Sequence, residues 1–199
     1  MSGFVKEFLS ESTEIIKNID HSIIDQIVAL LVETRNKGGR LFIVGSGGGA
    51  GHASHAVCDF RKLCGIEAYA PSDNIAELTA RVNDEGWEVS ALNWLKVSRF
   101  SANDSVFVFS VGGGNDEKKI SQNLVNVVQY AKQIGAKVVG VVGKDGGYTK
   151  KAGDAVLVIP VVNSQRITPH TEGFQALIWH LIVSHPDLQI NPTKWESTK

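Results

Sequence analysis

The chain has 199 residues, of which 43% are hydrophobic and 21% are charged, and its formal net charge is −1. These values are typical of a single globular domain that can bury a sizeable core, and they exclude the strongly basic balance of a general nucleic-acid binder. No apolar run approaches the ~20 residues of a membrane span, the charged N-terminal stretch does not resemble a secretory signal, and two cysteines make no disulfide framework. We therefore expect a cytoplasmic protein with no nucleic-acid or membrane partner.

The first 38 residues carry apolar side chains three and four positions apart, from Phe8 to Leu31. This spacing predicts one or two amphipathic helices that are interrupted near Asp20 and end at Gly38 and Gly39. We expect one domain over 1–199, made of these N-terminal helices over 1–38, a core over 40–186 and a tail over 187–199. The last ten residues, INPTKWESTK from Ile190 onward, are expected to be loose, with Trp195 as the residue that could dock.

From residue 40 onward the pattern changes to short, uninterrupted apolar runs: RLFIVG, EAYA, SVFVFSVGGG, AKVVGVVG and DAVLVIPVV. Uninterrupted apolarity indicates strands that are covered on both faces, as in a parallel sheet. Helices are predicted between these runs and after the last one, over 51–63, 75–82, 87–98, 117–134 and 172–184. Strands that alternate with helices predict a three-layer αβα sandwich around a five-stranded parallel sheet.

Glycine is concentrated where the predicted strands end, in GSGGGAGH after the first strand and SVGGGND after the third. In parallel sheets ligands bind outside the carboxyl ends of the strands, and a helix N-terminus beyond a glycine turn attracts anions. Each loop alone is equally well explained as a tight turn, but together they favour a phosphorylated ligand. Asn115 or Asp116 is expected to cap the helix that follows. The candidate ligand-binding residues in these loops are Ser46, Gly47, Gly48, Ser110, Gly112, Gly113, Gly114 and Asn115.

Histidines and carboxylates are placed to share helix faces in two segments. On the helix after the first loop they are His52, His55 and Asp59, and on the last helix they are Glu172 and His180. We expect His55, Asp59, Glu172 and His180 to meet, with His52 and His170 in reserve. Imidazole and carboxylate together suit a divalent ion, most simply zinc, and they also suit proton transfer. The alternatives are a solvated helix pair for His55 and Asp59, and a satisfied core histidine for His180.

Several motifs resemble the sugar isomerase (SIS) domain, and within it the phosphoheptose isomerases: LFIVGSGGGAGHASHAVCDFRK, RVNDEG, VFVFSVGGGN, AKVVGVVGKDGGYTKKAGDAVLVIP and FQALIWHLIV. The resemblance runs from about Leu41 to Ser184. It implies interconversion of sedoheptulose 7-phosphate and a heptose 7-phosphate aldose through a cis-enediol. It also implies a homotetramer with active sites between subunits, and a zinc ion in some members.

The resemblance assigns roles to individual residues. His55 falls on a metal-binding histidine, Asp59 on a glutamate that is both metal ligand and acid/base, and His180 on a catalytic, metal-binding histidine. Glu172 falls on a glutamine ligand, and Asp84, preceded by Asn83, matches an active-site aspartate. We expect His180 and either Asp59 or Glu172 to carry the proton transfers.

The sequence also departs from the family pattern. The phosphate loop of the family is rich in serine and threonine, whereas Ser110 is followed here by valine and three glycines. Asp59 is one methylene shorter than glutamate, and Glu172 adds a negative charge. A sugar-phosphate sensor or protein-interaction module without catalysis is therefore an alternative, although it would not need four ligand positions. Nucleotide-cofactor chemistry is less favoured, because no acidic residue closes the second strand.

Overall fold

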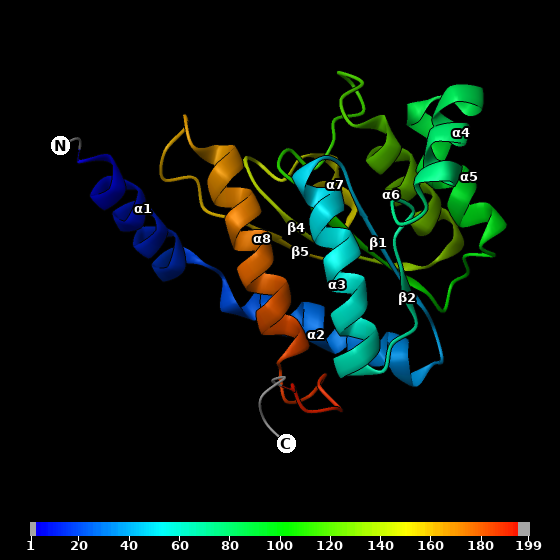
Figure 1. Ribbon diagram of the computed structural model, residues 1–199, viewed down its shortest axis with the longest axis horizontal. Coiled ribbons are helices and arrows are strands. Elements are labelled where there is room, and N and C mark those ends of the chain that lie inside the picture. The colour runs from blue at the N-terminus through cyan, green and yellow to red at the C-terminus, as the bar shows by residue number, and fades with distance from the viewer. Residues whose placement is uncertain (1–2, 195–199) are drawn as a thin grey trace.

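The computed structural model describes residues 3–194, which form eight helices around a five-stranded sheet (Figure 1). The N-terminal segment forms two helices, α1 (Phe4–Asn18) and α2 (His21–Asn36), as predicted. The break comes at Asp20, whose side chain accepts a hydrogen bond from Ser22 N at 3.0 Å and so caps α2. The remaining helices are α3 (Gly48–Cys64), α4 (Ile75–Glu85), α5 (Trp87–Val97), α6 (Gln122–Ile134), α7 (Gly147–Ala152) and α8 (Ile167–Val183).

All strands of the sheet run parallel, in the order β2-β1-β3-β4-β5. Their bounds are β1 (Leu41–Gly45), β2 (Ala68–Tyr69), β3 (Ser105–Ser110), β4 (Lys137–Val142) and β5 (Ala155–Val158). The order reverses between β1 and β3, and such a switch point opens a crevice at the carboxyl ends of the two strands. The predicted three-layer αβα architecture is confirmed.

The helices divide between the two faces of the sheet. Leu41 and Ile43 of β1 pack with the buried side chains of α2, α3 and α8, while Phe42 and Val44 pack with those of α5 and α6. This alternation follows from the two-residue period of a strand. Helix α4 has no buried residue and lies mainly on α5.

Two predicted helix starts are wrong by about five residues, smaller differences affect the start of α3 and the end of α4, and one helix was not predicted. Helix α6 begins at Gln122, not at residue 117, because Asn115 and Ile120 pair through two backbone hydrogen bonds and make the residues between them a separate turn. Its N-cap is Ser121, so the expectation that Asn115 or Asp116 caps this helix is also wrong. Helix α8 begins at Ile167, before the predicted start at residue 172, and α7 is too short to show a helical period.

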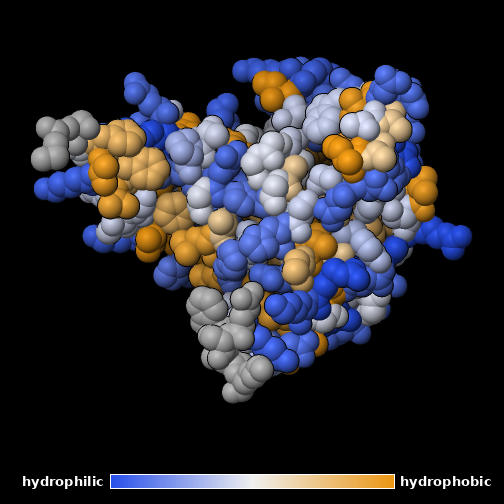
Figure 2. All heavy atoms as spheres, viewed as in Figure 1, coloured by the Kyte–Doolittle hydropathy of each residue, from blue (hydrophilic) through white to orange (hydrophobic). Residues whose placement is uncertain are grey.

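A group of polar contacts centred on Glu11 attaches helix α1 to the rest of the chain. Glu11 accepts hydrogen bonds from Arg166 Nη2 at 2.9 Å and Asn163 Nδ2 at 2.7 Å, and it lies 2.8 Å from His170 Nε2. These contacts, from Arg166 first, lower the pKa of Glu11 to about 2. Ile15 is the buried residue of the helix, whereas four apolar side chains are exposed. They are Phe4, Val5, Leu9 and Ile16. Figure 2 shows hydrophobic surface over this helix.

The start of the C-terminal tail is docked, which corrects the expectation of a loose segment from Ile190 onward. Leu188 is fully buried, and the backbone N–H groups of Ile190 and Asn191 both donate to Leu63 O. Asn191 Nδ2 also donates to Lys62 O at 2.9 Å, so this stretch covers the end of α3. The predicted docking of Trp195 lies outside the described residues.

A buried carboxylate ties the amino ends of β1 and β3 together. Asp104 is 2% exposed and accepts hydrogen bonds from Arg40 N, Arg40 Nη2 and Ser101 N at 2.8–2.9 Å. Burial opposes ionisation of Asp104, but the bonds from Arg40 and Ser101 outweigh it, so the pKa of Asp104 lies below its ordinary value. The ionised carboxylate therefore stabilises the fold above the ordinary pKa of aspartate, and this stability is lost as the pH falls through the lowered pKa.

We expect Asp104→Asn to lower the free energy of unfolding at pH 7 by about 2–3 kcal/mol, because charge-assisted hydrogen bonds are lost from a buried site. Urea unfolding of both proteins at pH 7 and below pH 4 measures this, and the difference should shrink at the lower pH. Asp116→Asn is the control, because Asp116 pairs with Lys119 at the surface. Equal stability of the two variants at pH 7 would contradict the role of Asp104.

Candidate functional site

The glycine turn after β1 fixes where α3 begins. Gly47 has φ of +57°, which glycine adopts without strain, and it precedes the first residue of the helix. A Cβ at Gly49 would lie 2.4 Å from Phe109 O of β3. The turn therefore brings the start of α3 directly against the neighbouring strand, at the crevice between β1 and β3.

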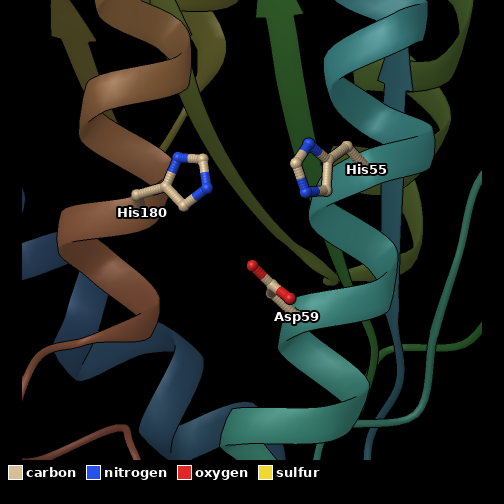
Figure 3. Close-up of side chains that lie close together, drawn as sticks. All are labelled: His55, Asp59 and His180. Atoms are coloured by element: carbon tan, nitrogen blue, oxygen red, sulfur yellow. The ribbon is translucent and has the colours of Figure 1, made fainter. Parts of the chain in front are cut away.

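Three of the four predicted metal-ligating side chains meet between α3 and α8 (Figure 3). His55 and Asp59, one turn apart on α3, point toward His180 of α8, and one ligand atom from each lies within 4.8 Å of the others. Two imidazoles and one carboxylate are donors that zinc and similar ions prefer, at ligand distances of about 2.0–2.2 Å. Small rotations of these partly exposed side chains would close the set around an ion, so the donor set fits a divalent cation.

One hydrogen bond orients the imidazole of His180. Its Nδ1 lies 2.7 Å from Ala176 O, so Nδ1 carries the proton and Nε2 is left with a free lone pair. A backbone carbonyl bonded to the second ring nitrogen is the usual support of a metal-binding histidine. His180 is exposed rather than buried, so the reading of a satisfied core histidine is wrong.

Glu172, the fourth predicted ligand, lies outside this cluster. Its carboxylate covers the first residue of α3, since a Cβ at Gly48 would lie 2.5 Å from Glu172 Cδ. His52 faces the same region: burial lowers the pKa of His52, and the negative charge of Glu172 opposes this shift. Glu172 and His52 thus flank the glycine turn, beside the cluster of His55, Asp59 and His180.

The loop after β3 packs tightly against the start of α7. Gly113 O accepts hydrogen bonds from Thr149 N and Thr149 Oγ1, and Gly114 O accepts one from Tyr148 N. Gly113 N donates to Ser110 Oγ at 3.0 Å. These glycines are required by packing, because a Cβ at Gly113 would lie within 2 Å of a backbone oxygen of the neighbouring turn. Gly112 has open space around it and remains the most accessible of the three glycines.

The structure separates several predicted site residues from the cluster. Asn83 and Asp84 lie on α4, exposed and hydrogen-bonded to each other at 2.7 Å, on the α5 side of the sheet. Asn115 accepts a hydrogen bond from Lys118 N within its own turn. His170 is buried beside Glu11 at the other end of α8, so it is no reserve ligand.

Two residues near the site were not predicted. Asn123, in the first turn of α6, donates from Nδ2 to Ser46 Oγ at 3.1 Å and so links the two glycine loops. Trp179 lies against the imidazoles of both His55 and His180. No sequence pattern marked either residue as part of the site. Asn123 lay inside a helix that was predicted to start earlier, and Trp179 matched an ordinary apolar core position.

The described part of the chain contains no helix that is both long and apolar enough to cross a membrane.

Comparison with protein families matches residues 7–143 to the SIS domain. The lincomycin biosynthesis protein LmbN of Streptomyces lincolnensis is 32% identical over 91% of this chain and 68% of its own length. A phosphoheptose isomerase of Helicobacter pylori is 30% identical over 89% of this chain and 90% of its own.

Solved structures share the fold. Phosphoheptose isomerase GmhA from Neisseria gonorrhoeae matches with a TM-score of 0.77 at 22% identity, over 90% of this chain and 95% of its own. A phosphoheptose isomerase from Francisella tularensis matches with a TM-score of 0.79 at 20% identity, over 92% and 97%. The chain therefore belongs to the SIS domain family, in its phosphoheptose isomerase branch, and it is an isomerase.

Proposed function

We propose that the protein interconverts an aldose phosphate and a ketose phosphate, with sedoheptulose 7-phosphate and a heptose 7-phosphate as the first pair to test. The observation that carries this proposal is the convergence of His55, Asp59 and His180 beside the glycine turn. The name of the Helicobacter pylori relative supports the substrate pair. Another relative of similar identity is named for lincomycin biosynthesis, so other sugar phosphates belong in the test.

The reaction moves a proton between two neighbouring carbons through a cis-enediol, and it needs a group that removes and returns this proton. We assign this role to Glu172, because it lies beside the glycine turn but outside the cluster of His55, Asp59 and His180. A carboxylate that is not holding an ion stays free to accept a proton. The family has glutamine at the position of Glu172 and glutamate at the position of Asp59. The carboxylate that transfers the proton would therefore lie on α8 in this protein, rather than on α3.

His55, Asp59 and His180 would hold a divalent ion, for which zinc is the first candidate given the nitrogen-rich donor set. When bound, such an ion polarises the carbonyl and stabilises the charge that develops on the enediol oxygens. Ala176 O keeps His180 Nε2 directed into the cluster, and one helical turn sets the spacing of His55 and Asp59. These residues therefore orient the reacting end of the sugar beside Glu172.

The phosphate group would lie at the crevice between β1 and β3. The first turn of α6 presents N–H groups there, as every helix N-terminus does. Ser46, Ser110, Gly112 and the backbone of Gly47 are placed at the same edge of the sheet. Few hydroxyl donors are available in the loop after β3, so we expect weaker phosphate binding than in a serine-rich loop.

The proposed assembly is a cytoplasmic homotetramer with active sites between subunits. Asp84 is exposed on α4 and outside the cluster of His55, Asp59 and His180, and we propose that it joins the site of a second copy. The exposed apolar side chains of α1 provide a surface for such contacts. Analytical ultracentrifugation of the full chain tests the oligomeric state.

Metal-stripped and zinc-reloaded protein should differ in turnover of sedoheptulose 7-phosphate. In D₂O, followed by proton NMR, we expect deuterium to enter the sugar and aldose to form only after zinc is added. Equal turnover without metal would contradict the role of the ion. Binding without any exchange, across a panel of sugar phosphates, would instead support a non-catalytic sensor.

His180→Ala should lower kcat by at least about 10–100-fold, because a side chain that would hold the ion is lost. Thermal unfolding should change little, since His180 is exposed. His185→Ala, just beyond the end of the same helix, is the control and should keep wild-type kcat. Near-normal turnover of His180→Ala would refute the assignment.

Glu172→Gln and Asp59→Asn should separate proton transfer from ion binding. We expect Glu172→Gln to abolish deuterium exchange, because the amide cannot accept the proton. Co²⁺ should still bind to this variant, because Glu172 lies outside the cluster of His55, Asp59 and His180. Asp59→Asn should weaken Co²⁺ binding by about 10–100-fold, because a charged ligand is lost. The reverse pattern would assign the proton transfer to Asp59.

A further inference from the structure

Trp179 is fully buried between α8 and the body of the protein, and it touches both imidazoles of the cluster. Its ring lies stacked on that of His180, with centroids 3.4 Å apart and planes inclined by 28°. The His55 ring meets it at 4.7 Å and 67°. One indole therefore limits the rotation of the two histidines, whose centroids are 5.5 Å apart.

Packing alone does not explain an indole at this position. Trp179 Nε1 is buried, and it has no hydrogen-bond partner among residues 3–194. An unpaired buried N–H group costs stability, and such groups in native structures call for an explanation. Phenylalanine would fill much of the same space without this cost, so stability does not account for the choice of tryptophan.

The contact between Trp179 and His180 favours an electron-poor imidazole ring. The face of an indole is electron-rich and attracts cations and electron-poor rings. An imidazole becomes electron-poor when its Nε2 binds a metal ion, and Ala176 O on the opposite nitrogen already directs Nε2 into the cluster. The stacked indole therefore stabilises the ion-bound form of His180 more than the free form.

We propose that Trp179 is a positioning residue for a divalent cation, acting through the imidazoles of His180 and His55. This inference rests on the proposed metal-assisted function. It predicts that the aromatic face, rather than the volume of the side chain, sets part of the affinity for the ion.

The test is a Co²⁺ titration of metal-stripped wild type, Trp179→Phe, Trp179→Leu and Trp94→Leu, followed by calorimetry and by visible absorption of Co²⁺. Trp179→Leu should bind Co²⁺ about tenfold more weakly, as expected when support of a metal ligand is removed. Trp179→Phe keeps an aromatic face, but a weaker one than indole, and should bind Co²⁺ about threefold more weakly than wild type. Trp94 is the matched control, because it packs against Phe42 on the other face of the sheet.

Thermal unfolding of every variant separates loss of affinity from loss of fold. If Trp179→Leu does not fold, tryptophan fluorescence replaces the affinity measurement on that variant. Co²⁺ should quench the tryptophan emission of wild type, and Trp179→Phe should lose most of this quenching. Any of three results would overturn the inference. They are a Co²⁺ affinity of Trp179→Leu within twofold of wild type, a loss of Co²⁺ affinity in Trp94→Leu equal to that in Trp179→Leu, and unchanged quenching in Trp179→Phe.

Failure of this inference is distinguishable from failure of the proposed function. A wild type that isomerises sugar phosphate and binds Co²⁺, with Trp179 variants that bind it equally well, removes only the role of Trp179. A wild type that binds no Co²⁺ removes both the metal-assisted mechanism and this positioning role.

Discussion

The close approach of α3 to β3 determines where every side chain of the site lies. No side chain larger than hydrogen fits at Gly49, because Phe109 O occupies the space that a Cβ would need. Gly45 is restricted in the same way by the backbone of Gly49. These contacts fix the start and direction of α3, and its helical period then turns His55 and Asp59 toward α8. The glycines are therefore required by backbone packing first, and any contact with a ligand comes in addition.

Much of the fold could be predicted from the sequence, because buried parallel strands and amphipathic helices leave strong periodic signals. His55, Asp59 and His180 could be predicted as a group, since helical spacing and sheet topology together bring them to one place. The start of α6 could not, because the Asn115–Ile120 pairing depends on backbone hydrogen bonds that composition does not reveal. Glu172 lies apart from the other three residues because of the way α8 packs along α3. The spacing of Glu172 and His180 on one face of α8 does not specify this packing.

The two faces of the sheet contribute differently to the site. The gap between α3 and α8 holds the imidazoles and carboxylates, while α5 and α6 form an apolar layer that supports the crevice from the opposite side. The hydrogen bond from Asn123 to Ser46 joins the two faces at the point where the strand order reverses. A movement of α6 would therefore shift the glycine turn after β1, which positions α3.

The polar attachment of α1 also has a consequence for the order of events during synthesis. Its partners Asn163, Arg166 and His170 lie more than 150 residues further along the chain. At 5–20 residues per second, roughly 8–30 s pass between the appearance of α1 and that of its anchors. During this time the carboxylate of Glu11 lacks all three of these partners, so α1 cannot dock through them. Docking of α1 would then be among the last steps of folding, after the sheet is complete.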